Sequence, residues 1–205
     1  MNFGTVGSVV GVLLGAWVCL DMAGSGATSA APPAGATPTP VKGASFAPQR
    51  FALPEHGTLV LNVPTSWHAA FRTPPGAYPP IIGVTPAGGE KFELIVSVSW
   101  SKKAQTEAPR PEEVRVLIER TGQAGLAQAI EKTVKVKEFG SNGKKGYYIT
   151  LTHKAPKPDQ YRHMTQGAIG EGNFLLGFTL LMNNPKAVDQ QSILAMLSNA
   201  KQERK

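Results

Sequence analysis

Apolar and polar residues alternate along several stretches of the chain, which is the pattern of β-strands with one buried face. Between Phe92 and Trp100 every second residue is apolar, and Glu93, Ser97 and Ser99 occupy the opposite face. The stretch 174–182 is apolar on both faces apart from a glycine and a threonine, which predicts a central strand covered on both sides. We expect strands at 58–63, 67–71, 81–85, 92–100, 134–139, 145–153, 161–169 and 173–182.

Turn residues between these stretches predict how the strands pair. The Pro-Thr-Ser turn at 64–66 predicts a first hairpin between 58–63 and 67–71, and Gly-Glu-Gly-Asn at 170–173 predicts a tight hairpin before the central strand. A turn at 156–160 would join 145–153 to 161–169 and place His153 directly opposite His163. The proline-rich run 73–80 is expected to be a loop, because proline lacks a donor for a strand ladder.

Two segments change to helical spacing. A helix is expected to begin near Arg110, because Pro111 suits a first helical turn and apolar residues follow at helical spacing from Val114. Gly122 and Gly125 disfavour a helix interior and predict a bend or break. A final helix is expected from the Asn-Pro pair at 184–185, which can cap and begin it. Its buried stripe would consist of Val188, Ile193, Leu197 and Ala200.

The order strands, helix, strands, helix predicts an α+β fold: an antiparallel β-sheet of about six or seven strands with a central helix and a C-terminal helix packed on it. This order, together with the Val-Pro-Thr-Ser-Trp turn at 63–67, resembles the PsbP-like superfamily and in particular its bacterial DcrB-like members. The resemblance covers roughly residues 51–200. It implies a protein that acts by binding or assembly, and it brings no set of catalytic residues to this sequence.

The first part of the chain predicts export. The stretch 1–20 carries no charge, and small residues follow at 23–30, so we expect a signal peptide or an N-terminal anchor within 1–30, with cleavage after Ala27 or Ala30. An Ala/Pro/Thr-rich linker is expected at 31–47, followed by a single domain at 48–205. The protein would then be periplasmic or secreted. The alternative is a protein anchored in the membrane through residues 4–20.

Composition adds a class of partner to this picture. The chain has 21 Lys and Arg against 14 Asp and Glu, a formal net charge of +7. Its single cysteine, Cys19, lies in the segment expected to be removed, so no thiol or disulfide chemistry is expected in the mature domain. Basic residues cluster between 132 and 162, which favours an envelope protein or an anionic surface, such as a lipid headgroup or a cell-wall polymer, as the partner. Nucleic acid is not expected, because the aromatic interleaving used for base stacking is missing.

Lysine alternates with valine at 134–137, which predicts a strand with one basic face and one buried face. The candidate partner-binding residues are Lys135, Lys137, Lys144 and Lys145, with Tyr78 of the proline-rich loop as an aromatic candidate. The alternative interpretation is a solvated strand face whose lysines protect a sheet edge against aggregation.

His153 and His163 are weak candidates for a metal site. Two imidazoles on one face could supply half of a zinc or copper site, but the spacing identifies no third ligand. A polar pair at the rim of the sheet is the simpler interpretation, and the sequence predicts neither a metal nor a cofactor.

No local motif of a hydrolase, a metalloprotease, a phosphate loop or a dinucleotide site occurs in the sequence. The sequence therefore predicts an exported, non-enzymatic binding or assembly module of the cell envelope. The alternative is a hydrolase or a metal-dependent enzyme whose site has no local signature. The sequence does not indicate the oligomeric state.

Overall fold

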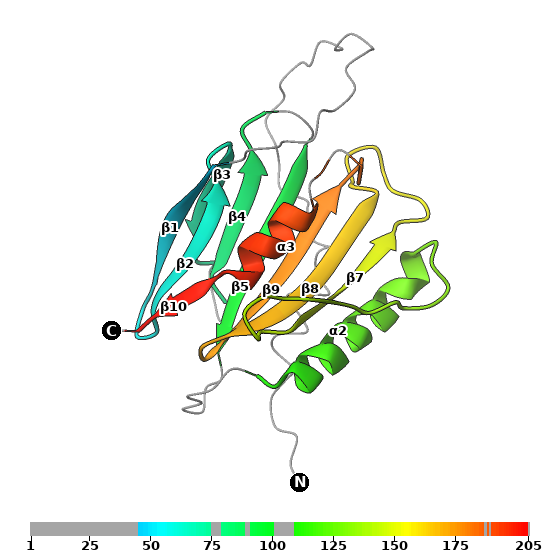
Figure 1. The fold of residues 1–205 in the computed structure, drawn as a ribbon. Helices are drawn as coiled ribbons and strands as arrows, with labels where there is room; N and C mark the ends of the chain where they lie inside the picture. Colours follow the sequence, from blue (N-terminus) through cyan, green and yellow to red (C-terminus); the bar gives the residue numbers. More distant parts are fainter. Residues whose placement is uncertain are drawn as a thin grey trace.

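The computed structural model describes residues 45–74, 79–88, 91–100, 109–186, 188 and 190–204 (Figure 1). Within these residues the chain forms two antiparallel sheets and two α-helices. The elements in chain order are β1 (Phe46–Leu53), β2 (Gly57–Pro64), β3 (Trp67–Arg72), β4 (Ile81–Pro86), β5 (Phe92–Trp100), α2 (Pro111–Gly125), a short 3-10 helix (Leu126–Gln128), β6 (Lys137–Phe139), β7 (Gly146–Thr152), β8 (His163–Glu171), β9 (Phe174–Met182), α3 (Gln190–Ser198) and β10 (Lys201–Glu203).

Seven strands form the main sheet in the order β3-β4-β5-β9-β8-β7-β6, and every neighbouring pair in it is antiparallel. Strands β1, β2 and β10 form a second, smaller sheet. Figure 1 shows α3 crossing in front of β5 and β9, with the small sheet beside it and α2 next to the β7 end of the main sheet. The predicted α+β fold, an antiparallel sheet with two packed helices, is confirmed.

Strand β9 forms the centre of the molecule and is buried along its whole length. Phe174, Leu176 and Phe178 face the core shared with α3 and the small sheet. Leu175 and Leu181 face the second core, beneath α2. Because side chains alternate across a strand, burial on both faces requires an apolar residue at almost every position. The prediction of a central strand covered on both sides is confirmed, as is the tight hairpin that precedes it.

Helix α2 begins at Pro111, as predicted. Of the bend or break expected at Gly122 and Gly125, the break occurs at Gly125, where α2 ends and the 3-10 helix follows, whereas the helix passes through Gly122 without interruption. A Cβ atom at Gly122 would lie 2.7 Å from Val134 Cγ1 and 2.9 Å from Ile149 Cδ1. Glycine therefore allows the helix to approach the sheet closely, which offsets its low helix propensity.

The hairpin predicted between 58–63 and 67–71 is wrong. Strand β2 pairs with β1 and β10, whereas β3 pairs with β4. The Thr65 N–H donates to the Ser45 carbonyl at 2.9 Å on the β1 side, and the Ala87 N–H donates to the Ser66 carbonyl at 2.9 Å on the β4 side. The turn between β2 and β3 therefore passes the chain from one sheet to the other.

Strand β1 was not predicted from the sequence, and its residues Phe46 and Ala47 fall in the stretch interpreted as a linker. Only Phe51 and Leu53 of this strand are buried, and Pro48 interrupts the strand pattern. Proline is tolerated here because β1 lies at an edge of the small sheet. Pairing with β2, more than its own sequence pattern, makes this segment a strand.

The register predicted between β7 and β8 is wrong by one residue. Thr152, not His153, lies opposite His163, and the shift of one residue holds along the whole β7–β8 ladder. This register places Leu151 opposite Met164, so that both side chains enter the core beneath α2. The predicted register would have paired that leucine with Thr165, which faces the other side of the sheet. Burial of the apolar face therefore selects the register.

The remaining differences concern element ends. The strand expected at 134–139 is reduced to β6, so Lys135 precedes the strand. The final helix begins at Gln190, later than expected. At the Asn-Pro pair the Asn184 side-chain oxygen instead accepts a hydrogen bond from the Lys186 N–H at 3.2 Å, which forms a turn. All four residues of the predicted stripe are buried, but only Ile193 and Leu197 lie within α3, whereas Val188 precedes the helix and Ala200 follows it.

Candidate functional site

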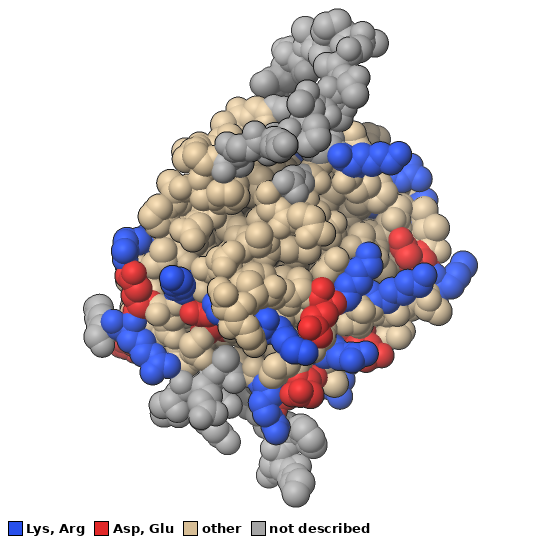
Figure 2. Space-filling model, viewed as in Figure 1, with Lys and Arg blue, Asp and Glu red and all other residues tan. Residues whose placement is uncertain are grey.

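Three of the clustered lysines line one depression next to the edge strand β6. This depression, which we call the lysine pocket, has a volume of about 340 Å³. Figure 2 shows charged side chains along the left, lower and right parts of the face that carries α3, whereas the upper central part of that face is largely uncharged. The residues lining the lysine pocket are Glu131, Lys132, Thr133, Lys135, Lys137 and Thr150.

Strand β7 contributes Thr150 to the lysine pocket and lies beneath Lys137. Lys137 lies opposite Tyr148 in the ladder, and its ammonium group is 5.8 Å from the centre of the tyrosine ring. Thr150 lies on the same face of β7 as Tyr148, because side chains two residues apart share a face. Its hydroxyl oxygen is 3.2 Å from that of Thr165, which is fully buried on β8. The sheet therefore presents the Thr150 hydroxyl to the lysine pocket, with the Thr165 hydroxyl buried behind it.

Glu131 is the acidic member of the lysine pocket. One of its carboxylate oxygens accepts the Thr152 N–H at 2.8 Å. Burial raises the pKa of this carboxyl, but hydrogen bonds from Thr152 and from its own backbone, with the nearby His163, outweigh burial and leave the pKa below its ordinary value. A carboxylate with a lowered pKa stays ionised and is a weak base, so it is poorly suited to general base catalysis.

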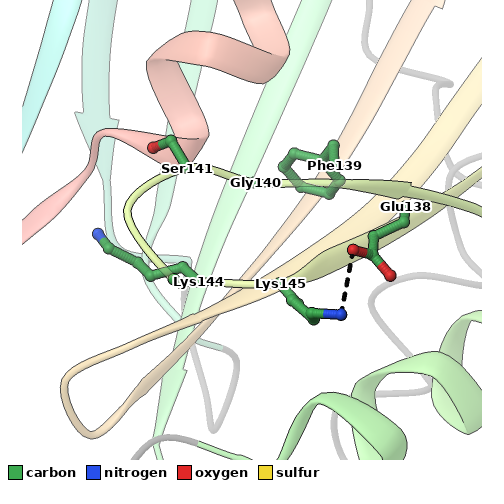
Figure 3. A pocket seen from close by; sticks show the side chains of 7 residues that line it. Glu138, Phe139, Gly140, Ser141, Lys144 and Lys145 are labelled. Atoms are coloured by element: carbon green, nitrogen blue, oxygen red, sulfur yellow. Dashed lines mark ion pairs between the residues drawn. The ribbon is translucent and has the colours of Figure 1, made fainter.

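Lys145 lies in the loop between β6 and β7, beside a different depression of about 380 Å³ (Figure 3). Its ammonium group is 3.4 Å from a Glu138 carboxylate oxygen, and Figure 3 shows the two side chains pointing toward each other. Glu138 lies opposite Tyr147, whose side chain faces the core beneath α2. The structure therefore places Lys145 on the other face of the sheet from Lys137.

Lys144 points away from Lys145, toward the C-terminal segment (Figure 3). Its ammonium group donates to a Glu171 carboxylate oxygen at 2.5 Å and to the Ala200 carbonyl at 2.8 Å. The other carboxylate oxygen of Glu171 accepts the Gln202 N–H at 2.9 Å. We call these four residues the C-terminal junction. Lys144 thus holds strand β10 to the β8–β9 hairpin and contributes no free charge to a partner surface.

The aromatic candidate Tyr78 lies outside the described residues. Trp67 on β3 and Trp100 on β5 pack against the core. The Trp67 ring packs edge to face on Phe92 at 5.0 Å between ring centres, and the Trp100 ring lies 4.1 Å from the centre of the His56 ring. Both tryptophans are partly buried against the larger hydrophobic cluster.

The structure separates the two candidate metal-binding histidines. His163 Nδ1 lies 3.4 Å from the Thr152 hydroxyl, whereas His153 Nε2 lies 3.3 Å from the Gln128 side-chain oxygen. Thr152 and His163 share one face of the sheet, so His153, one residue further along, faces the other way. Within the described parts of the chain, no three His, Cys, Asp or Glu side chains are grouped so that they could hold a metal ion.

Both histidines are expected to make folding weaker in mild acid. Burial lowers the pKa of His163, and Arg162 lowers it further while Glu131 raises it. Burial and then Lys154 lower the pKa of His153. In the unfolded chain these histidines take up protons near pH 6.5, whereas in the folded chain they do so only at lower pH. Their contribution to the free energy of unfolding is therefore fully present above about pH 6.5 and is lost as the pH falls from there through the folded-state pKa values.

Urea unfolding between about pH 7.5 and pH 5 measures this effect, because this range lies above the pKa values of most carboxyl groups. The wild type should lose stability over this range, and a variant with His153→Gln and His163→Gln should lose less. Equal losses in the two proteins would contradict the assignment.

Sequence reasoning missed the polar floor of the lysine pocket. Thr150 and Thr165 follow no motif, and their hydroxyl groups meet only because β7 and β8 pair in the observed register. The alternation of Tyr148, Thr150 and Thr152 on one face of β7 was the available signal. It would have indicated a polar strand face next to the lysines.

No α-helix in the described ranges is long and apolar enough to cross a membrane. No protein-family model matches the chain, and no curated protein matches it in sequence. Among solved structures, the chain is similar to the solution structure of cyanobacterial PsbP (CyanoP) from Synechocystis sp. PCC 6803, with a TM-score of 0.47 and 14% sequence identity. The match covers 84% of this chain and 100% of the cyanobacterial chain. The grouping with DcrB-like proteins stays a prediction.

Proposed function

We propose that the protein is an exported, non-enzymatic binding or assembly module of the cell envelope, and that the lysine pocket holds an anionic partner. The uncharged stretch 1–20 supports export. The partner would be a lipid headgroup, a cell-wall polymer or an acidic segment of an envelope protein, all of which carry the opposite charge.

The observation that carries this proposal is that some basic side chains in the described part of the protein form ion pairs within it and others do not. Among the described residues, the four ion pairs are Arg50–Glu203, Arg110–Glu113, Lys144–Glu171 and Lys145–Glu138. None of these pairs uses a lysine of the lysine pocket. Lys132, Lys135 and Lys137 therefore bring three positive charges to one depression, where a partner could compensate them.

Edge protection explains part of this arrangement. Strand β6 is three residues long and lies at the edge of the main sheet, and lysines beside such a strand oppose pairing with another chain. Edge protection does not require a concave surface or the Thr150 hydroxyl beneath the lysines. The depression and its threonine floor therefore favour recognition of an anion over simple solvation.

Reversing two charges of the lysine pocket is expected to weaken binding to isolated envelope material. The variant carrying Lys135→Glu and Lys137→Glu should bind at least about tenfold more weakly at low salt, because two attractive charges become repulsive. Its binding should also depend less on salt, since screening acts on charges that the variant lacks. Co-sedimentation over a salt series measures both quantities.

The matched control carries Lys186→Glu and Lys201→Glu, which change the net charge equally at exposed positions outside the lysine pocket. This control should bind nearly as well as the wild type, and both variants should keep the wild-type thermal midpoint. Binding that survives reversal of Lys135 and Lys137 at low and high salt would eliminate the electrostatic model.

A further inference from the structure

We propose that the ligand of the lysine pocket is a phosphate ester. The inference rests on the proposed function, because it names the chemistry of the anion bound at the same site. A phosphate ester could be presented by a lipid headgroup at a membrane surface or by a small soluble molecule, and the experiments below distinguish these two sources.

The lysine pocket is rich in hydrogen-bond donors. Each lysine offers three N–H donors and no acceptor. Within the described chain, the buried Thr165 hydroxyl has the Thr150 hydroxyl as its side-chain partner, at 3.2 Å. If Thr165 donates this bond, the Thr150 proton is free to point into the lysine pocket, whose floor this residue lines. An anion entering the pocket would thus meet ammonium groups and a hydroxyl donor together.

The geometry of these donors suits phosphate better than carboxylate. A carboxylate is planar, offers two oxygens and is matched by the planar fork of arginine. The lysine pocket contains no arginine, and Lys132, Lys135 and Lys137 are compact charges on separate flexible stems. Separate donors can surround the terminal oxygens of a tetrahedral phosphate group, while the Thr150 hydroxyl meets the same group from the sheet.

Charge and size agree with this ligand class. Three lysines and one glutamate leave a formal charge of +2 in the lysine pocket. A phosphate monoester carries a charge of about −1.5 to −2 at neutral pH. Glu131 directs one oxygen to the Thr152 N–H, so part of its charge is already engaged by the backbone. The volume of about 340 Å³ falls within the range of small-molecule sites and leaves room for the group that carries the phosphate.

The proposal is tested by titrating the full-length protein with inorganic phosphate and with glycerol 3-phosphate. The readout is the change in backbone amide chemical shifts. We expect saturable shifts around the lysine pocket with phosphate and glycerol 3-phosphate, and much smaller shifts with chloride at the same ionic strength. The variant with Lys135→Gln and Lys137→Gln should lose at least about tenfold in affinity. The control with Lys186→Gln and Lys201→Gln should bind as the wild type does.

Substitution of Thr150 separates a formed site from general attraction of anions. Thr150→Val keeps the charge and the strand shape but removes the hydroxyl donor, so it should weaken phosphate binding several-fold. Thr150→Ser keeps the donor and should restore binding. Equal affinity of the valine variant and the wild type would overturn the proposal, and so would equal shifts with chloride. If the valine variant does not fold, the lysine variants and their control decide the question.

Vesicles distinguish the two sources of phosphate. Sedimentation with vesicles that contain phosphatidic acid, a lipid with a phosphate monoester headgroup, would support a lipid source if it is lost in the Lys135→Gln and Lys137→Gln variant and negligible with phosphatidylcholine alone. Phosphate binding without vesicle binding would support a soluble ester. If envelope binding depends on Lys135 and Lys137 but neither phosphate nor these vesicles bind, the proposed function stands and the phosphate inference fails. If phosphate binds at the pocket but envelope material does not, the proposed function fails instead.

Discussion

Replacing Phe178 with alanine is expected to lower the free energy of unfolding by about 3 to 5 kcal/mol, the usual range for removal of a buried aromatic side chain. Phe178 is 1% exposed and lies in the centre of β9. It covers Gly167 on β8, where a Cβ atom would lie 2.5 Å from the Phe178 ring, and it packs edge to face with Phe139 at 5.7 Å between ring centres. Alanine would therefore leave a cavity between the main sheet and α3 that backbone movement cannot fill.

Urea unfolding measures this loss, and Val116→Ala provides the control. Val116 is 46% exposed on α2, so its truncation should change the free energy of unfolding by no more than about 0.5 kcal/mol. A loss below about 1 kcal/mol for Phe178→Ala would show that β9 does not form the core described above.

Replacing Glu171 with alanine is expected to cost about 3 kcal/mol, because it leaves a partly buried ammonium group without its partner. Within the C-terminal junction, the Glu171 side chain is 14% exposed and that of Lys144 is 27% exposed. The substitution also removes the acceptor of the Gln202 N–H. Strand β10 should therefore separate from the hairpin, and amide exchange of residues 201–203 should accelerate before global unfolding.

A double-mutant cycle with Lys144→Ala isolates the ion pair within this effect. The double variant should be less destabilised than the sum of the single variants, because it leaves no unpaired charge behind. The control is Glu203→Ala, which breaks the exposed pair with Arg50 and should cost less than about 1 kcal/mol. Equal costs for Glu171→Ala and Glu203→Ala would contradict the role of the C-terminal junction.

The hydrophobic pattern of the sequence was sufficient to predict a segment's structure where the surroundings of that segment are uniform along its length. Strand β9 is apolar at nearly every position because both of its faces are covered, and the start of α2 at Pro111 follows from local helix chemistry. The Gly-Glu-Gly-Asn hairpin is also local, since Gly172 adopts a φ of 59° that glycine tolerates best. These features depend on residues that are neighbours in sequence.

The candidate site was only partly predictable for the same reason. Sequence clustering identified Lys135 and Lys137, which the structure does bring together. The same clustering also suggested Lys144 and Lys145, although one is engaged by Glu171 and the other by Glu138. Glu171 lies on β8, outside the lysine-rich segment, so its pairing with Lys144 cannot be read from that segment. Glu138 lies within the segment, but it is the pairing of β6 with β7 that brings it to Lys145.

The sequence by itself therefore determined the class of fold, most of the strands, the central strand and the presence of a basic segment. Tertiary structure decided which strands pair, which register β7 and β8 adopt, and which lysines keep an uncompensated charge. The physical reason is that periodicity records which face of a segment is buried but not what buries it. Strand partners, register and ion pairs depend on residues distant in sequence, and packing of the two cores selects among arrangements that each segment alone would allow.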